Sequence, residues 1–576
     1  MESFTLDEIT DMYMTVNPTL MRDFDPQKFV EEAPDIDISP IIDIVCHKII
    51  QNTSPKTHSP YIFQKQYDEI IYLSDIHADI LSLTCNLIQA GYLSFVDIKG
   101  VPRTKDGLIN EILLNYNTFN VWDLLMNYNI VFGDEQYRSM SKKTCIVFVG
   151  DLIDGLRGEV SVKNRWGLNE LGIHIMLYQL RISAIEIGSQ IHILYGNHEF
   201  ETLIRPSSHM EFYEDRYECL FVDIIVRALM NPTERCLLLL PFYLIDNSMF
   251  KLVVDFNDLD ELNAVLLSIE RSGIERERTL ETHLKYIVCH GGFNQDIKFD
   301  DHPPSSVKID YTFDSLVQYN RSISAMIWSL TPLQLYDIKP PTKLHRYMDV
   351  SGLKTIPSAN INDYAVVDII YNLITARSLF FHFVKNETGD IILNSHVPSD
   401  QTTQCALIKE HFKKTTLIMG HCITHSITID SPSLDLCFDR DRSSTTKECI
   451  YPMCVQKDTR IPNIIFIDNA IAIQNTLHKR TEVTTVRYKN YFTKNGKQSG
   501  TVDGNVTVRY PNSIPIFNEL LCVTKHNEIK IIRNLFSIDK VGYDKAITVG
   551  RGKTNIYDIS IEDAVLLPTR KLEGVD

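Results

Sequence analysis

Six short apolar segments, most of them ending in a turn of Asp, His or Gly, are the feature that most constrains this chain. They lie at 70–73, 144–149, 191–195, 286–289, 416–419 and 463–467. Short apolar runs bounded by turns are typical of buried strands in a sheet. Helical patterns lie between them, notably at 79–91 and 168–188. Strands that alternate with helices predict a layered α/β fold.

Composition excludes several classes of protein. The chain has 576 residues, 44% hydrophobic and 23% charged, which is ordinary for a globular protein of two to four domains. The net charge of −17 disfavours non-specific binding of nucleic acid by the whole chain. No apolar run is long enough to span a membrane, and the N-terminus MESFTLDEIT lacks a signal-peptide pattern. The 12 cysteines form no CxxC pair, so we expect a cytoplasmic chain in a reducing compartment.

Changes in composition and residue pattern along the sequence predict three regions. An acidic extension covers 1–62, and the main domain covers 63–475. Helix-rich insertions are expected in the main domain near 92–140 and 200–280. A β-rich C-terminal segment covers 476–576, where apolar and polar residues alternate between hairpin-type turns.

The C-terminal segment leaves two questions open. It could fold alone or pack on the main domain, and we expect it to influence the choice of partner instead of the chemistry. Its stretch 479–509 holds seven basic and two acidic residues. This stretch is either an ordinary solvated face or a contact for an anionic partner.

Polar side chains follow five of the predicted strands, where α/β folds keep their functional sites. They are Asp75, His77, Asp151, Asp154, Asn197, His198, His290, His421 and His425. A single histidine at a strand end is most often a core residue, but five strand ends with such groups indicate a site. The mixture of carboxylate, amide and imidazole suits two divalent ions such as Mn²⁺ or Fe, and not a Cys-rich structural zinc site.

Two ions close together require a bridging carboxylate and can hold both the attacking and leaving oxygens of a displacement at phosphorus. The leaving alkoxide needs a proton donor, usually a histidine held by a carboxylate. Asp154, three residues after the candidate bridging residue Asp151, could orient His198 in that role.

The ordered motifs resemble those of the calcineurin-like metallophosphoesterases, which are DxH, GDxxD, GNHE, a His before Gly-Gly, and a late GH. They stand here at 75–77, 150–154, 196–199, 290–292 and 420–421. The segments LIQAGYL, VCHGGF, AMIWSL, LIMGH and FIDNA look most like the phosphoprotein phosphatases, particularly their bacterial-type, Shewanella-like branch. The resemblance covers roughly 68–475 and implies a metallophosphoesterase-type β-sandwich flanked by helices.

The resemblance also implies roles for individual residues. Asp75, His77 and Asp151 would hold the first ion, with Asp151 bridging. Asn197, His290 and His421 would complete the second ion's ligands. His198 would be the general acid, paired with Asp154, and a metal-bridging hydroxide would attack phosphorus. The implied cofactors are two divalent metal ions, Mn²⁺ first, with Fe or Zn as alternatives.

The region expected to bind the phosphate departs from the family pattern. Phosphoprotein phosphatases usually carry DRG where this chain has DGLRG at 154–158, so their substrate-clamping arginine is absent from its expected place. Arg157 and Arg205 are the candidate replacements, although each could equally be a surface arginine. Tyr195 occupies a slot that is Arg in many members. His425 lies four residues after His421 and is assigned to substrate contact or to support of the ligands.

These observations lead to one expected function and two alternatives. The expected function is a protein serine/threonine phosphatase, which acts on a phosphorylated protein. The first alternative is a phosphohydrolase for a small phosphoester, such as a dinucleoside polyphosphate. The second alternative is a non-catalytic scaffold that kept the fold.

Overall fold

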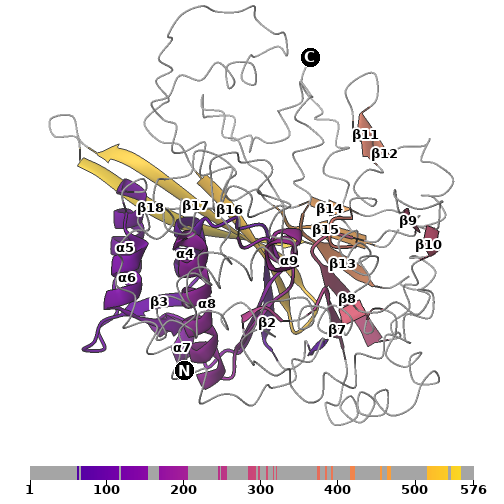
Figure 1. The fold of residues 1–576 in the computed structure, drawn as a ribbon. Helices are drawn as coiled ribbons and strands as arrows, with labels where there is room; N and C mark the ends of the chain where they lie inside the picture. The colour runs from indigo at the N-terminus through magenta and orange to yellow at the C-terminus, as the bar shows by residue number, and fades with distance from the viewer. Residues whose placement is uncertain are drawn as a thin grey trace, which may run out of the picture.

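The fold was analysed in a computed structural model of the chain (Figure 1). The structure describes residues 61–63, 67–115, 119–153, 168–204, 244–246, 248–255, 283–292, 296–298, 306–308, 316, 319–320, 373–376, 383–385, 391–393, 415–421, 454–456, 463–468, 516–541 and 547–559.

The first six-stranded sheet, called sheet 1, has the order β18-β17-β16-β2-β5-β6. Its strands are β2 (Glu69–Leu73), β5 (Thr144–Phe148), β6 (Gln190–Ile193), β16 (Ile516–Thr524), β17 (Ile529–Val541) and β18 (Ile547–Ile559). Strands β2, β5 and β6 are parallel, whereas β16, β17 and β18 continue the sheet in antiparallel fashion. The polar turns after the three parallel strands therefore leave the sheet at the same edge.

The second six-stranded sheet, called sheet 2, has the order β1-β7-β8-β13-β15-β14. Its strands are β1 (Tyr61–Phe63), β7 (Phe250–Val254), β8 (Leu284–Cys289), β13 (Thr416–Met419), β14 (Cys454–Gln456) and β15 (Asn463–Phe466). Strands β8, β13 and β15 are parallel, and β7 is antiparallel to β8. All six strands predicted from apolar segments are present, three in each sheet.

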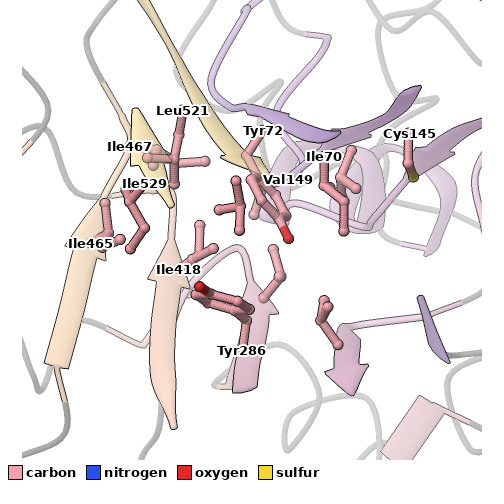
Figure 2. Close-up of a cluster of buried hydrophobic side chains, with 14 of the residues drawn as sticks. Ile70, Tyr72, Cys145, Val149, Tyr286, Ile418, Ile465, Ile467, Leu521 and Ile529 are labelled. Carbon is pink, nitrogen blue, oxygen red and sulfur yellow. The ribbon is translucent and has the colours of Figure 1, made fainter. Parts of the chain in front are cut away.

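One hydrophobic cluster joins the two sheets (Figure 2). Sheet 1 contributes Ile70 and Leu521, and sheet 2 contributes Val288, Ile418 and Ile465, all of them buried. Burying one such side chain stabilises the fold by about 1.5–3 kcal/mol. The cluster holds the two sheets together, and so fixes how the turns of one sheet face the turns of the other.

Helices cover the other face of sheet 1 (Figure 1). They include α4 (Ile80–Gln89), α5 (Lys105–Leu114) and α8 (Leu168–Glu186). Helix α4 begins at Asp79, whose side chain accepts a hydrogen bond from Ser82 N at 3.1 Å, an ordinary N-cap. A buried hydrogen bond of 3.0 Å from Asn534 Nδ2 to Asn86 Oδ1 ties α4 to β17. The predicted helices at 79–91 and 168–188 are confirmed.

The expected insertion near 92–140 contains helices and one small sheet. Its elements are β3 (Leu93–Val96), α5, α6 (Val121–Asn127), β4 (Asn129–Phe132) and α7 (Glu135–Ser139). Strands β3 and β4 form an antiparallel pair. Two further antiparallel pairs are β9 (Asp296–Lys298) with β10 (Ser306–Lys308), and β11 (Phe383–Lys385) with β12 (Ile391–Leu393).

The described part of the C-terminal segment extends sheet 1. Strand β16 is hydrogen-bonded to β2, with Val523 opposite Ile70, and Leu521 and Val523 lie in the core cluster. The described residues 516–541 and 547–559 therefore continue sheet 1 beyond β2. The basic stretch 479–509 and residues 1–60 lie outside the described residues.

The mixed α/β class is confirmed, while the specific metallophosphoesterase layout and the domain boundaries stay predictions. Among the described residues, no helix combines the length and the apolar character that a membrane crossing requires.

Candidate metal centre

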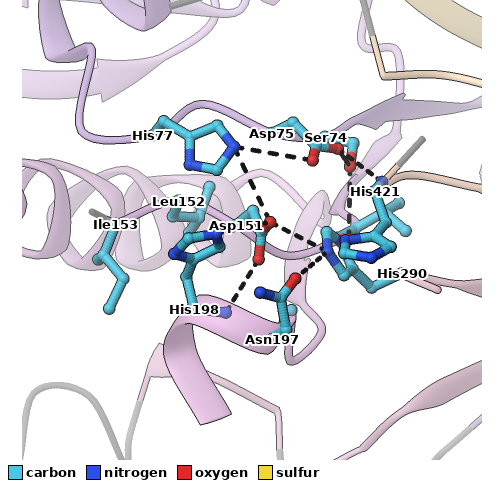
Figure 3. Close-up of polar contacts among 12 residues, drawn as sticks. Ser74, Asp75, His77, Asp151, Leu152, Ile153, Asn197, His198, His290 and His421 are labelled. Atoms are coloured by element: carbon cyan, nitrogen blue, oxygen red, sulfur yellow. Dashed lines mark hydrogen bonds and ion pairs between the residues drawn. The ribbon is translucent and has the colours of Figure 1, made fainter. Parts of the chain in front are cut away.

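The six predicted ligand residues lie together where strands of both sheets end (Figure 3). Sheet 1 supplies three groups: Asp75 and His77 after β2, Asp151 after β5, and Asn197 at the start of α9 (Asn197–Ile204) after β6. Sheet 2 supplies His290 after β8 and His421 after β13. All six side chains are buried. Their roles as metal ligands stay predictions.

Asp151 lies at the centre of this group. Its Oδ2 is 3.1 Å from His290 Nε2, 3.6 Å from His198 Nε2 and 3.9 Å from His77 Nε2. Its Oδ1 accepts a hydrogen bond of 3.1 Å from His198 N. One carboxylate oxygen that faces three imidazole nitrogens is suited to sharing between two cations.

The ring of His290 is oriented by a backbone contact. Its Nδ1 lies 2.7 Å from Val149 O, which can only accept, so we assign the proton to Nδ1. Nε2 then points toward Asp151 and lies 3.1 Å from Asn197 Oδ1. A backbone carbonyl that fixes the tautomer of a histidine is the usual support behind a metal ligand.

The charges in this group are strongly coupled. Burial would raise the pKa of Asp151, but the nearby imidazoles of His290, His198 and His77 outweigh it and hold that pKa well below the usual range. Burial opposes a charge on His290, yet the Asp151 carboxylate raises the pKa of His290 to about 9. A buried carboxylate that stays ionised needs a cation beside it, and in the metal-free chain protonated His290 supplies one.

The backbone is strained at the same positions. Four residues have φ angles in the left-handed region that residues other than glycine rarely adopt. They are Asp75 (57°), His77 (46°), Asp151 (54°) and His421 (62°). Each such residue costs about 1–3 kcal/mol and persists only where its surroundings fix it. Hydrogen bonds from Asp75 N to Gly150 O (3.1 Å) and from His77 N to Asp151 O (2.9 Å) supply that support.

Two glycines of the motifs are required by close contact between these turns. A Cβ on Gly150 would lie 2.4 Å from Gly196 N, and a Cβ on Gly196 would lie 2.2 Å from Asp151 Oδ1. Both distances are well inside van der Waals contact. The glycines therefore allow the turns after β5 and β6 to touch, which brings Asp151 next to Asn197.

Glu199 is a residue of this site to which the sequence analysis gave no role. Its carboxylate accepts hydrogen bonds from Asp151 N (2.8 Å), Leu152 N (2.6 Å), Ile153 N (3.2 Å) and Gly196 N (2.9 Å). It therefore holds the turn that carries Asp151. The sequence did contain a signal for this role. Glu199 is an acidic residue in the first turn of a helix that directly follows a strand.

Two groups of side chains meet the geometric requirement for a metal site among the described residues. They are His77, Asp151 and His198, and Asp151, His290 and His421, with ligand atoms within 4.8 Å of one another in each group. Asp151 belongs to both groups. The first group includes His198, which the sequence analysis assigned to proton donation, so the geometry brings that ring within reach of a cation as well.

Asp154, Arg157, Arg205 and His425 lie outside the described residues, so their assignments stay predictions. Tyr195 is described and fully buried, and its backbone N–H donates to Ser248 O at 3.3 Å. Its ring is packed inside the protein, and not presented to a substrate.

No protein-family model and no curated protein matches the sequence. A crystal structure of a cold-active protein-tyrosine phosphatase from a psychrophilic Shewanella species is similar over 83% of this chain and 80% of that chain, with 12% identity and a TM-score of 0.31. A second structure of a cold-active protein tyrosine phosphatase covers 82% of this chain and 78% of its own, with 13% identity and a TM-score of 0.33. Such TM-scores are too low to bear on fold or activity, so the residues of the site must support any functional conclusion.

Proposed function

We propose that this chain is a metal-dependent phosphoric ester hydrolase of the calcineurin-like metallophosphoesterase type, similar to the phosphoprotein phosphatases. The observation that carries the proposal is the position of Asp151, a buried carboxylate shared by two groups that could each hold a cation. Mixed carboxylate, amide and imidazole donors suit divalent ions such as Mn²⁺, Fe or Zn.

The residues divide between two ions. Asp75, His77 and Asp151 would hold one, and Asp151 with Asn197, His290 and His421 would hold the other. When bound, a pair of divalent ions supplies Lewis-acid stabilisation of a phosphoryl group and activates water. In the metal-free chain, the proton on His290 balances the negative charge of Asp151. A bound cation would balance that charge in place of the proton, so His290 would be protonated without metal and neutral as a ligand.

His198 is the proposed general acid. Its backbone N–H is fixed on Asp151 Oδ1, and its ring packs edge-on against His77 with centroids 4.9 Å apart. This holds Nε2 beside the cation site, where a protonated ring could donate to the leaving oxygen of a phosphoester. Asp154 is proposed to orient the ring.

The scaffold alternative is disfavoured by the energetics of the site. Four left-handed backbone positions, at Asp75, His77, Asp151 and His421, cost about 1–3 kcal/mol each and do nothing for packing. Such features persist where a site needs them. We therefore propose that the chain is a catalyst. The proposed substrate is a phosphorylated protein, in which the phosphoester bond of phosphoserine or phosphothreonine is hydrolysed.

Metal analysis together with hydrolysis assays tests this proposal. The purified chain should bind two Mn²⁺ per molecule and hydrolyse p-nitrophenyl phosphate only when loaded. Peptides with phosphoserine, phosphothreonine and phosphotyrosine, and a dinucleoside polyphosphate, then separate the substrate classes. Asp151→Asn should abolish turnover and weaken binding of both ions. An Asp151→Asn variant with normal metal content and activity would refute the shared carboxylate.

A further inference from the structure

A second buried cluster of charged groups lies outside the candidate metal centre. Asp246 is fully buried, and its carboxylate contacts three side chains. Oδ2 lies 2.8 Å from Lys251 Nζ and 2.5 Å from His192 Nδ1, while Oδ1 accepts from Arg181 at 3.0 Å. We call these four residues the Asp246 cluster. Arg181 also donates to the backbone oxygen of Leu244 at 2.7 Å.

The Asp246 cluster connects both sheets and one helix. His192 belongs to β6, the edge strand of sheet 1, and Lys251 belongs to β7 of sheet 2. Arg181 belongs to α8. The backbone N–H of Asp246 also donates to Ile193 O at 2.8 Å, directly at the end of β6. The Asp246 carboxylate therefore links side chains of β6 and β7, which belong to different sheets, and it acts beside the backbone hydrogen bonds from Asp246 N to Ile193 O and from Tyr195 N to Ser248 O.

Both strands have one end beside the candidate metal centre. Asn197 follows His192 by five residues, at the start of the helix after β6. On the other sheet, Lys251 pairs in register with Val288, two residues before His290. Asn197 and His290 meet across the two sheets, with Oδ1 and Nε2 at 3.1 Å. The relative position of β6 and β7 therefore sets the relative position of two proposed ligands of the second ion.

We propose that the Asp246 cluster is a positioning device for the second metal ion, because it fixes the spacing of Asn197 from His290. The inference rests on the proposed two-metal function. The first ion's proposed ligands, Asp75, His77 and Asp151, all follow strands of sheet 1, so their spacing from one another does not depend on the link between the two sheets. Disturbing the cluster should therefore weaken one ion selectively. Removing a group that supports a metal ligand typically lowers affinity by about 10- to 100-fold.

The test measures Mn²⁺ binding by isothermal titration calorimetry on the full chain, with circular dichroism as the check of folding. In Asp246→Asn, one of the two binding steps should lose about 10-fold in affinity, while the other step stays as in the wild type. Lys251→Met carries the same test if Asp246→Asn does not fold, since it leaves Asp246 paired with Arg181.

Glu69→Gln is the matched control. Glu69 is also a buried acid, paired with Lys142 and accepting from Tyr92 Oη at 3.0 Å, but it lies at the start of β2, away from the strand ends. The Glu69→Gln substitution should lower the unfolding temperature and leave the affinities of both Mn²⁺ binding steps unchanged.

Two outcomes would overturn this inference but not the two-metal function. In the first, both cluster variants bind Mn²⁺ in two normal steps. In the second, both steps are weakened equally. A wild-type chain that binds no Mn²⁺ would overturn the two-metal function itself, and this inference with it.

Discussion

Replacing Glu199 by glutamine tests whether one carboxylate holds the turn that carries Asp151. The four backbone N–H groups divide evenly between the two oxygens: Leu152 and Ile153 donate to Oε1, and Asp151 and Gly196 donate to Oε2. A glutamine side chain keeps one oxygen and presents an NH₂ group in place of the other. Two buried N–H groups would then face a donor instead of an acceptor.

The expected loss of stability follows from these contacts. A buried donor without its acceptor costs about 1–3 kcal/mol, so two donors give roughly 2–6 kcal/mol. Burial, and then the charge of Asp151, raise the pKa of Glu199, which shows that its ionised form is itself destabilised. Removing that charge offsets part of the loss, so we expect a net decrease of about 2–4 kcal/mol in the free energy of unfolding.

Urea unfolding in the presence of EDTA measures this decrease without a contribution from bound metal. Because the turn moves Asp151, turnover of p-nitrophenyl phosphate should also fall, by roughly 10²-fold for a displacement near 1 Å. The comparison is Glu69→Gln, which removes another buried acid and should retain turnover. A Glu199→Gln chain within about 0.5 kcal/mol of wild type, with normal turnover, would refute the assigned role.

Four further predictions address other parts of the molecule. His198→Ala should lower kcat by roughly 10²–10⁴ for a phosphoserine peptide and by less for p-nitrophenyl phosphate, whose leaving group hardly needs a proton; equal losses in steady-state assays would argue for positioning instead. Gly196→Ala should lower Mn²⁺ content measured by atomic absorption, because its Cβ would lie 2.2 Å from Asp151 Oδ1; normal content would show that the turn adapts. Burial lowers the pKa of His174 from 6.5 to about 4, so the unfolded chain binds a proton that the folded chain does not. Stability should therefore fall by about 1.4 kcal/mol per pH unit as the pH drops from 6.5 toward 4, and His174→Leu should flatten that slope in urea unfolding. Deleting the segment from residue 516 onward should give insoluble protein, because it exposes β2 and removes core side chains; a soluble, folded truncation seen by circular dichroism would contradict the arrangement of sheet 1.

Much of the candidate site was visible in the sequence because strands and their ends are encoded locally. Short apolar runs predicted the strands that became β2, β5, β6, β8, β13 and β15. The polar residue after each run marked a strand end, and parallel strands bring such ends to one edge of a sheet. The pattern of strand ends therefore places Asp75, Asp151 and Asn197 together.

The tertiary structure decided what depends on contacts between distant segments. Strand β16 joins β2 from more than 440 residues away, which no local pattern specifies. The carboxylate of Glu199 serves the turn after β5, so its role appears only once β5 and β6 are adjacent. Asp246 links β6 to β7 across two sheets in the same way. Periodicity in a sequence reports the burial of one element, whereas the partners of a buried charge are set by which elements pack together.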